Sequence, residues 1–285
     1  MWKQQVVTGT FPDDVKIIDK RYKVPMVMIH DRWDTKPISQ EIDIVSFDGN
    51  EIPLLTPNVI AIHLSISQNA EKDAMELFER IKQNIKDKKE DSKHPEKKNE
   101  VLRERSKLVC DYLEEIQTSI IFAISAIETF SNMSIPSDYI YKIESSKKTE
   151  LYNKQQIERN ITLKDKISKI LADVYNTKSL PEQSFWNDLV ELIKIRDNIV
   201  HQKNIDDTFY NEILYEKRIF QRIESSTLLI NFFQDNVISQ KENQMNLDFW
   251  PIIEDRPIMF HLIDGKNVEP EVGQYPHKKS SKKKI

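Results

Sequence analysis

Apolar residues recur at two different spacings along this chain, and the spacing changes near residue 68. Before that point, residues 41–47 and 59–66 alternate apolar and polar side chains, which is typical of half-buried β-strands. Asp-Gly-Asn at positions 48–50 predicts a hairpin turn. Residues 24–29 form a short apolar run with Pro25 near its start, which favours an edge strand. The sequence therefore predicts a small N-terminal sheet.

Beyond this region, apolar residues recur every three to four positions, which predicts amphipathic helices. The predicted helices cover residues 70–86, 100–133, 162–175, 185–201 and 208–238. Pro136 and Pro181 fall between them and should end one helix and interrupt the chain before another. Residues 137–160 are polar and less regular, so we expect a loop there. The fold class is mainly α with a β-containing N-terminal region, and its helices form an up-and-down bundle.

A charged run without apolar residues follows the first predicted helix. Residues 87–99 contain one proline and are otherwise polar, so we expect a solvated linker and a domain boundary. The predicted organisation is a small α+β domain over 1–86, the linker over 87–99, a helical bundle over 100–240, and a C-terminal arm and tail over 241–285. Residues 247–263 are strand-like and could rejoin the sheet or clasp a second subunit. The basic tail could contact phosphate or only aid solubility.

The amino-acid composition excludes several classes of binding site. The chain has 285 residues, of which 39% are hydrophobic and 31% charged, as expected for a helix-rich soluble protein. With only four glycines, it has no glycine-rich phosphate loop and no dinucleotide fingerprint, so we expect no nucleotide cofactor. The net charge of −4 gives no general attraction to nucleic acid, and any RNA contact must come from a local basic patch.

The cysteine, the apolar runs and the histidines bear on cellular compartment and on metal binding. Cys110 is the only cysteine, so no disulfide can form within the chain, and we expect a small core residue in a reducing cytosol. The N-terminus has no apolar signal region, and the longest apolar run, 120–127, is too short to cross a bilayer. The prediction is a cytoplasmic protein without a membrane segment. His30 and His63 could face each other across a sheet and bind a metal, but nothing fixes that geometry, and structural roles are favoured.

Candidate functional side chains are concentrated in the predicted helix of residues 185–201. Its predicted apolar stripe runs through Phe185, Leu189, Leu192, Ile193 and Val200. Arg196 lies seven residues past Leu189, on the same stripe, so its guanidinium must find an anion or remain buried and unpaired. Asp197 and His201 lie four residues apart and share the adjoining face. The helix therefore ends with a guanidinium, a carboxylate and an imidazole along one border.

This ending resembles the signature of the HEPN superfamily. Ribonucleases of that family carry an arginine, then a polar residue, then a histidine a few positions on, near the end of a helix; here these are Arg196, Asp197 and His201. The run 120–130 looks like the family's first core helix, where an acidic residue, here Glu128, often lies near the arginine. The resemblance covers roughly residues 105–240 and implies a HEPN-like bundle. It leaves the N-terminal third and the C-terminal tail unexplained.

Spacing by itself is a weak signal. Arg256 and His261 repeat the spacing of Arg196 and His201, but Pro257 lacks an amide hydrogen and no helical stripe surrounds it. That second stretch therefore cannot present the pair in the same way. A structural alternative also exists for the first, in which Arg196 pairs with a core acid and His201 is a cation favoured at a helix end.

The resemblance implies a metal-independent endoribonuclease, acting as a toxin or phage-defence effector on transfer or messenger RNA. Imidazole is the side-chain group whose free pKa lies near neutrality, so His201 can act as base or acid, and the planar guanidinium of Arg196 matches phosphoryl oxygens. Asp197 would orient the imidazole, Asn198 would add a hydrogen bond, and Glu128 would hold Arg196. One histidine cannot fill both proton-transfer roles, and the family supplies the second by forming a homodimer across the motif helix.

Two further readings remain open. The chain could be a HEPN-fold module without catalysis, serving as an RNA-binding or assembly subunit. A weaker possibility is pairing with an antitoxin or regulatory subunit that blocks the motif.

Overall fold

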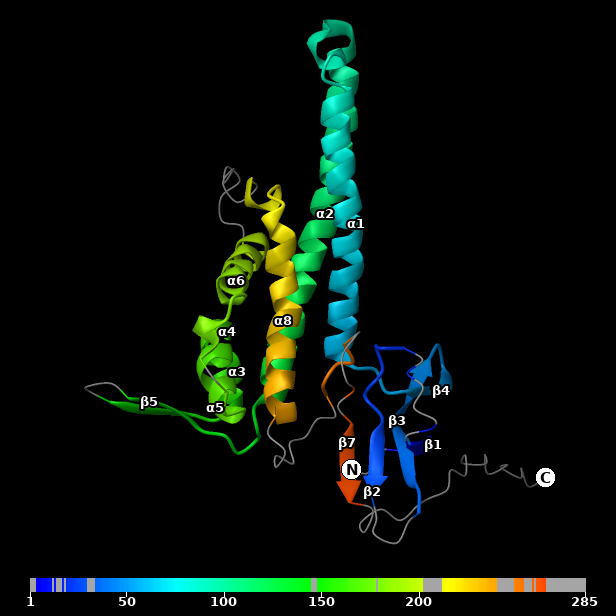
Figure 1. The fold of residues 1–285 in the computed structure, drawn as a ribbon, viewed down its shortest axis with the longest axis vertical. Helices are drawn as coiled ribbons and strands as arrows, with labels where there is room; N and C mark the ends of the chain where they lie inside the picture. The colour runs from blue at the N-terminus through cyan, green and yellow to red at the C-terminus, as the bar shows by residue number, and fades with distance from the viewer. Residues whose placement is uncertain are drawn as a thin grey trace, which may run out of the picture. The chain divides into compact units, whose positions relative to one another are not determined.

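A computed structural model describes residues 4–11, 13, 17, 19–29, 34–144, 148–177, 179–201, 212–239, 249–253, 258 and 260–264. The chain forms two compact units, one of residues 1–61 with 244–285 and the other of residues 62–243. The first unit contains the large sheet, and the second contains most of the helical residues (Figure 1). The protein is thus mainly helical with a small N-terminal β region, as the sequence predicted.

The first unit is built on one mixed sheet. Its strands are β1 (Gln4–Phe11), β2 (Met26–Ile29), β3 (Lys36–Phe47), β4 (Asn50–Leu55) and β7 (His261–Asp264). The order is β1-β3-β2-β7, with β4 also on β3, and only the β2–β7 pair is parallel. Asp48 and Gly49 have φ values of 48° and 78°, which confirms the predicted turn between β3 and β4.

The predicted edge position of residues 24–29 is wrong. Strand β2 pairs with β3 on one side and with β7 on the other. Pro25 precedes the strand, so its missing amide hydrogen interrupts no ladder, and Val27 and Met28 are buried. The second neighbour comes from the far end of the chain, so part of the predicted C-terminal arm does rejoin the sheet.

Residues 59–66 are not the predicted strand but the first turns of α1 (Val59–Asp87). Ile60, Leu64 and Ser67 are buried, which is a helical and not an alternating period. Asn58 starts the helix, because its Oδ1 accepts a hydrogen bond from the Ala61 amide at 3.0 Å. The alternation arose because apolar residues also occupy less buried positions of the helix.

The predicted linker is not where the chain divides. Residues 87–99 connect α1 to α2 (Pro95–Ser134) through a 3₁₀ turn, η1 (Asp91–Lys93), and the boundary between the units lies at residues 61 and 62. The two helices run together as a hairpin, in which Asn84 Nδ2 donates to Glu104 Oε1 at 3.2 Å. The charge run is solvated, as expected, because it forms the end of this hairpin.

The core of the second unit lies where α2, α6 (Trp186–Val200) and α8 (Arg218–Ser239) pack on one another. Buried side chains recur at helical spacing along α2 and include Tyr112, Ile116, Ile120, Ile127 and Phe130. The Phe130 ring contacts the rings of Tyr175 and Phe233. The helix ends at Ser134, just before Pro136, as predicted. Cys110 is exposed, contrary to the prediction, because it lies off this stripe.

Residues 137–160, predicted as a loop, contain regular structure. They form a two-stranded sheet of β5 (Tyr141–Glu144) and β6 (Thr149–Tyr152), followed by α3 (Lys154–Asn160). Asn153 and Gln156 make a capping box at the start of α3. The polar composition hid the hairpin, since a two-stranded sheet needs few buried residues.

A continuous helical segment follows α3. It consists of α4 (Leu163–Asp165), one π-helical stretch labelled η2 (Lys166–Leu171), and α5 (Ala172–Val174). Thr162 caps it, as predicted, by accepting a hydrogen bond from the Asp165 amide at 3.2 Å. A short 3₁₀ turn, η3 (Leu180–Glu182), leads toward α6. Across the ranges that the structure describes, no helix combines the length and apolarity needed to span a bilayer.

Asn58 carries a testable share of the stability of the first unit. Beyond capping α1, its Nδ2 donates to the carbonyls of Phe249 and Trp250, each at 3.0 Å, so it ties the helix start to a segment distant in sequence. Asn58→Ala should lower the free energy of unfolding by about 2–3 kcal/mol, measured by urea denaturation. Asn69→Ala, at an exposed site on the same helix, should change it by less than about 0.5 kcal/mol. Equal effects of the two changes would contradict this role.

Glu71 on α1 gives the second unit a pH-dependent stability. Burial raises the pKa of its carboxyl from 4.5 to about 7, and the nearby charge of Glu224 on α8 adds to the rise. Because the folded state holds this proton more tightly than the unfolded chain, the contribution is complete below pH 4.5 and is lost as pH rises through about 7.

Glu71→Gln should therefore stabilise the protein by about 1–2 kcal/mol at pH 8 and change little at pH 4.5, measured by denaturation at both pH values. Glu76→Gln, exposed on the same helix, is the matched control. A pH-independent effect of Glu71→Gln would refute this account.

Candidate functional site

Helix α6 packs against α2 and α8 along a stripe offset from the predicted one. The buried residues are Trp186, Leu189, Leu192 and Ile195, whereas Val200 is exposed. The helix therefore leaves the core as it approaches its C-terminus. That geometry places residues 196–201 at the border between packed interior and solvent.

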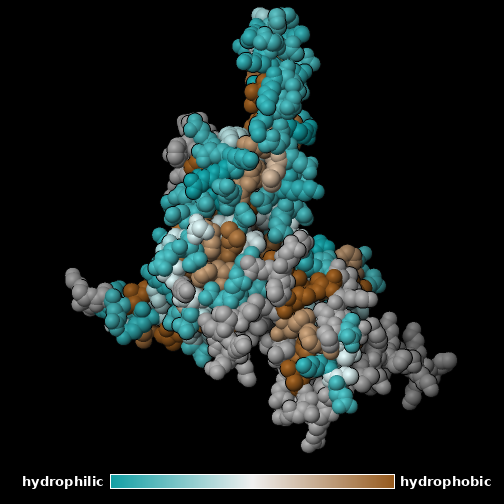
Figure 2. Space-filling model, in the orientation of Figure 1, coloured by the Kyte–Doolittle hydropathy of each residue, from teal (hydrophilic) through white to brown (hydrophobic). Residues whose placement is uncertain are grey.

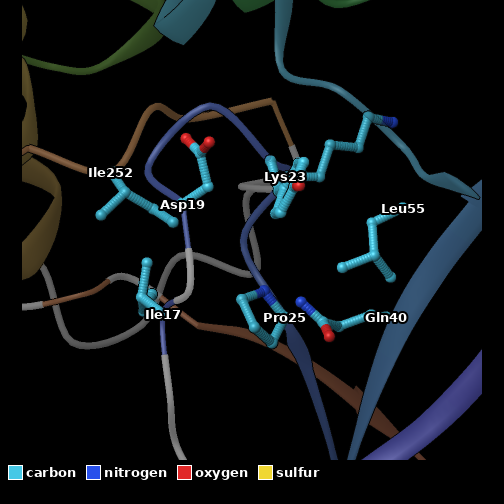
Figure 3. A pocket seen from close by; sticks show the side chains of 8 residues that line it. Ile17, Asp19, Lys23, Pro25, Gln40, Leu55 and Ile252 are labelled. Carbon is cyan, nitrogen blue, oxygen red and sulfur yellow. The ribbon is translucent and has the colours of Figure 1, made fainter.

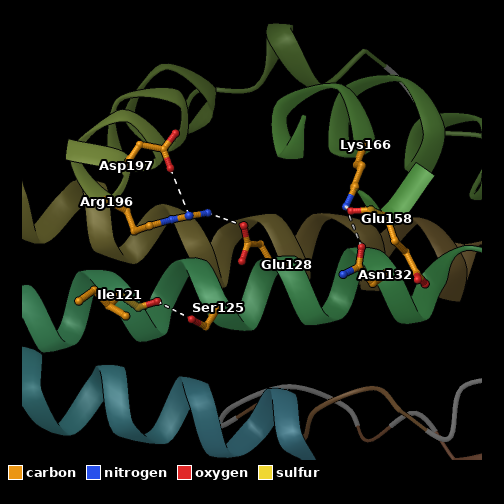
Figure 4. Close-up of polar contacts among 8 residues, drawn as sticks. All are labelled: Ile121, Ser125, Glu128, Asn132, Glu158, Lys166, Arg196 and Asp197. Atoms are coloured by element: carbon orange, nitrogen blue, oxygen red, sulfur yellow. Dashed lines mark hydrogen bonds and ion pairs between the residues drawn. The ribbon is translucent and has the colours of Figure 1, made fainter. Parts of the chain in front are cut away.

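Arg196 finds the anion that its position on the stripe requires. Its Nη2 donates to Glu128 Oε1 on α2, which confirms the pairing expected from the sequence (Figure 4). Its Nη1 lies 3.2 Å from Asp197 Oδ1. The Arg196 side chain is only 18% exposed, while those of Glu128 and Asp197 are 43% and 53% exposed. The guanidinium is thus held from two helices, and solvent reaches it past the carboxylates.

The guanidinium is not fully satisfied by these two partners. Its Nε is buried and has no hydrogen-bond partner among the residues that the structure describes. A buried donor without an acceptor costs free energy, so the arginine is held in place by its two terminal nitrogens at some expense to stability. The two carboxylates fix the plane of the fork, which determines where a third anion could approach.

Asp197 does not take its predicted role toward His201. Its carboxylate is engaged by Arg196, and the contact to His201 is a backbone one, in which the histidine amide donates to the Asp197 carbonyl at 2.9 Å. His201 has φ −115° and ψ 35°, so it caps the helix and departs from its path. The adjacent guanidinium captures the aspartate because a fixed positive charge is its strongest available partner.

The imidazole of His201 is exposed at this helix end. Within the described ranges it makes no hydrogen bond or ion pair with Arg196, Asp197, Asn198 or Glu128. Asn198 is half-buried, and no hydrogen bond of its side chain to a described residue supports the predicted role. The structure therefore brings Arg196, Asp197 and Glu128 together, whereas the His201 side chain contacts none of them in the described part of the chain.

Lys166 is a residue of this site that the sequence reasoning missed. It is buried in the π-helical stretch η2, and its Nζ donates to Asn132 Oδ1 at 3.0 Å and to the Glu158 carbonyl at 2.9 Å. Burial lowers the pKa of Lys166, an effect partly opposed by the charges of Glu128 and Glu158. Glu128 thus acts on both cations, and Asn132 lies one turn after it on α2.

A signal for Lys166 was present in the sequence. It lies three residues past Leu163 on the same apolar stripe, the observation that singled out Arg196. The π-helical turn was not predictable from that pattern. Such turns insert one residue into a helix and often occur at functional sites.

Among the described residues, the other histidines add no further site. His63 lies on helix α1, and its ring packs against Phe122 with centroids 5.7 Å apart. His30 and Arg256 lie outside the described residues, and His261 lies on β7. No group of three or more potential metal ligands gathers in the part of the chain that the structure describes.

A small pocket in the first unit carries less chemistry. Asp19, Lys23 and Gln40 line it together with apolar side chains (Figure 3). Its charged groups are already engaged, since Arg21 binds Asp19 at 2.6 Å and Lys23 lies 3.3 Å from Glu41. The end of α6 therefore remains the strongest candidate.

Comparison of the chain with models of protein families, with curated proteins and with solved structures found no match.

The Arg196–Glu128 pair can be tested by its coupling energy. In a double-mutant cycle of Glu128→Gln and Arg196→Met, we expect a coupling of about 1 kcal/mol in the free energy of unfolding, because the arginine is largely buried while the glutamate is partly solvated. The matched pair Glu191–Lys194 is exposed on the same helix and should couple by less than about 0.5 kcal/mol. A coupling no larger than in this control would show that the pair does not join the two helices.

Proposed function

We propose that this protein is a metal-independent endoribonuclease whose active site forms where two copies bring the C-terminal ends of α6 together. The observation that carries the proposal is the exposed His201 at the end of the helix that holds Arg196, with the arginine fixed by Glu128 from another helix. A proton-transfer group and a phosphate-binding group thus share one border of the molecule.

His201 supplies the proton chemistry in this proposal. Cleavage of RNA requires removal of a proton from the 2′-hydroxyl and delivery of one to the departing 5′-oxygen. An exposed imidazole can carry either step near neutral pH. The products are a 2′,3′-cyclic phosphate and a 5′-hydroxyl, and no metal ion takes part.

Arg196 stabilises the charge that develops on the phosphorus. Its Nη2 stays on Glu128, and its Nη1 can exchange the half-exposed carboxylate of Asp197 for a phosphoryl oxygen. Glu128 is therefore a positioning residue. Asp197 forms an ion pair with the guanidinium in the free protein, and the substrate phosphate replaces it on binding.

The second proton-transfer group comes from a second copy. Each chain places one histidine at this end of α6, whereas the reaction uses one group as base and another as acid. A two-fold arrangement supplies His201 from both copies to a shared cleft. The likeness to HEPN ribonucleases supports this dimer, a role as a toxin or defence effector, and transfer or messenger RNA as the substrate. It also supports control by an antitoxin or regulatory subunit.

A second candidate is a non-catalytic RNA-binding or assembly module. It is favoured by one observation, namely that Arg196 is already paired with two carboxylates and that Asp197 does not orient His201. In that case Arg196 joins α2 to α6, and His201 is a surface residue.

The decisive experiment is RNA cleavage by the purified protein in the presence of EDTA. We expect cleavage that survives the chelator and yields cyclic phosphate ends, and His201→Ala should reduce its rate at least about hundredfold. Arg196→Lys should also reduce the rate strongly, because a lysine keeps the charge but loses the planar fork.

His94→Ala is the matched control, because His94 is exposed at the far end of the α1–α2 hairpin. Circular dichroism must show that each variant is folded. Cleavage unchanged in folded His201→Ala, or abolished by EDTA, would reject this mechanism. RNA binding without cleavage by the wild-type protein would favour the non-catalytic module.

A further inference from the structure

The β5–β6 hairpin of the second unit forms a two-stranded sheet of its own. Its two strands pair only with each other in the ranges described, in the register that sets Lys142 opposite Leu151 and Ile143 opposite Glu150. The hairpin extends away from the helices of its unit (Figure 1). An isolated two-stranded sheet is only marginally stable in water, and its edge strands offer unpaired backbone donors and acceptors. A further strand would stabilise it.

Apolar side chains on and beside this hairpin are exposed. Leu151 on β6 is 61% exposed, and Ile140, just before β5, is 53% exposed. Figure 2 shows apolar surface on this projecting arm. Along β5, Lys142 and Glu144 are exposed on one face, while Tyr141 and Ile143 on the other are partly covered. The arm thus combines an open edge with solvent-exposed apolar area.

The charges along β5 are arranged so that two antiparallel copies of the strand place opposite charges next to each other. Lys142 and Glu144 lie on either side of Ile143 in the sequence, share the face of the strand opposite to it, and form an ion pair. When two copies of this strand pair antiparallel about a two-fold axis through Ile143, Lys142 of each copy lies opposite Glu144 of the other. Registers centred on Lys142 or on Glu144 would instead set like charges directly opposite each other.

We propose that β5 is a dimerisation strand, which pairs antiparallel with β5 of a second copy of this chain to form a four-stranded sheet. The two Ile143 side chains meet at the centre on one face of the sheet, and two Lys142–Glu144 pairs form on the other face, one on each side of the two-fold axis. Opposed β-branched side chains and opposite charges are both favourable cross-strand pairs. The outer edge of β5 would be closed by main-chain hydrogen bonds.

The other edge of the hairpin provides the comparison. Lys148, just before β6, and Glu150, on β6, lie on either side of Thr149 in the same pattern. A β6 pairing would be centred on two threonines, and β6 also contacts α3, into which it leads. Strand β5 is therefore favoured, and the β6 charges serve as a matched control.

This inference shares with the proposed function only the pairing of two copies, names a separate contact surface, and does not depend on catalysis. A dimer joined by β5 without RNA cleavage would leave the inference standing and reject the nuclease. RNA cleavage by a protein that dimerises independently of β5 would do the reverse.

Charge reversal tests the proposed register. Sedimentation equilibrium of the full chain should show a dimer whose dissociation constant rises at least about tenfold in Lys142→Glu and in Glu144→Lys, because each change opposes two pairs of like charges. The double variant carrying both changes should recover dimerisation. An equimolar mixture of the two single variants should also form heterodimers, since every cross-strand pair is then of opposite charge.

Reversal of Lys148 or Glu150 should leave the dissociation constant within about twofold of wild type. A monomeric wild-type protein, or a dimer unaffected by reversal at 142 and 144, would overturn the proposal. So would a dimer dissociated only by reversal at 148 and 150, which would place the contact on β6. Heterodimers from the mixed single variants distinguish this register from a general loss of folding.

Discussion

The second unit depends on how one guanidinium is accommodated at the border of its core. Arg196 lies on a helix whose neighbouring positions are buried, and its charge is tolerated there because Glu128 reaches it from α2 and Asp197 from the next position. The pair links two helices that also pack through apolar side chains, and it lies at the solvent border of that packing. The helix end that follows, with Val200 and His201, lies in solvent.

Local periodicity was sufficient to predict most helices, because α2, α6 and α8 bury one continuous stripe. It failed at residues 59–66, where apolar residues fill both exposed and buried helical positions and so imitate a strand. Asn58 was the available sign of a helix start. The place of β2 in the sheet was beyond local reasoning, because its second partner, β7, lies more than two hundred residues away in the chain.

The sequence allowed prediction of those contacts of the candidate site in which a charged side chain is buried and therefore needs a partner. A charge on an apolar stripe requires a counterion, and this reasoning correctly joined Arg196 to Glu128. It should also have singled out Lys166, whose partners are mainly neutral oxygens. Exposed side chains are not constrained in this way. Asp197 could face the histidine or the arginine, and helical spacing alone did not show that the nearer permanent charge would hold it.

The carboxylates at this site largely offset its cations, which limits how an anionic ligand can bind. Two cations, Arg196 and Lys166, lie among the carboxylates of Glu128 and Asp197, so a single copy presents little net positive charge to a phosphate. A phosphoryl oxygen must therefore displace Asp197 or be drawn by a second guanidinium. Pairing two copies supplies that second arginine along with the second histidine, so in the proposed mechanism the same assembly meets the electrostatic and the proton-transfer requirements.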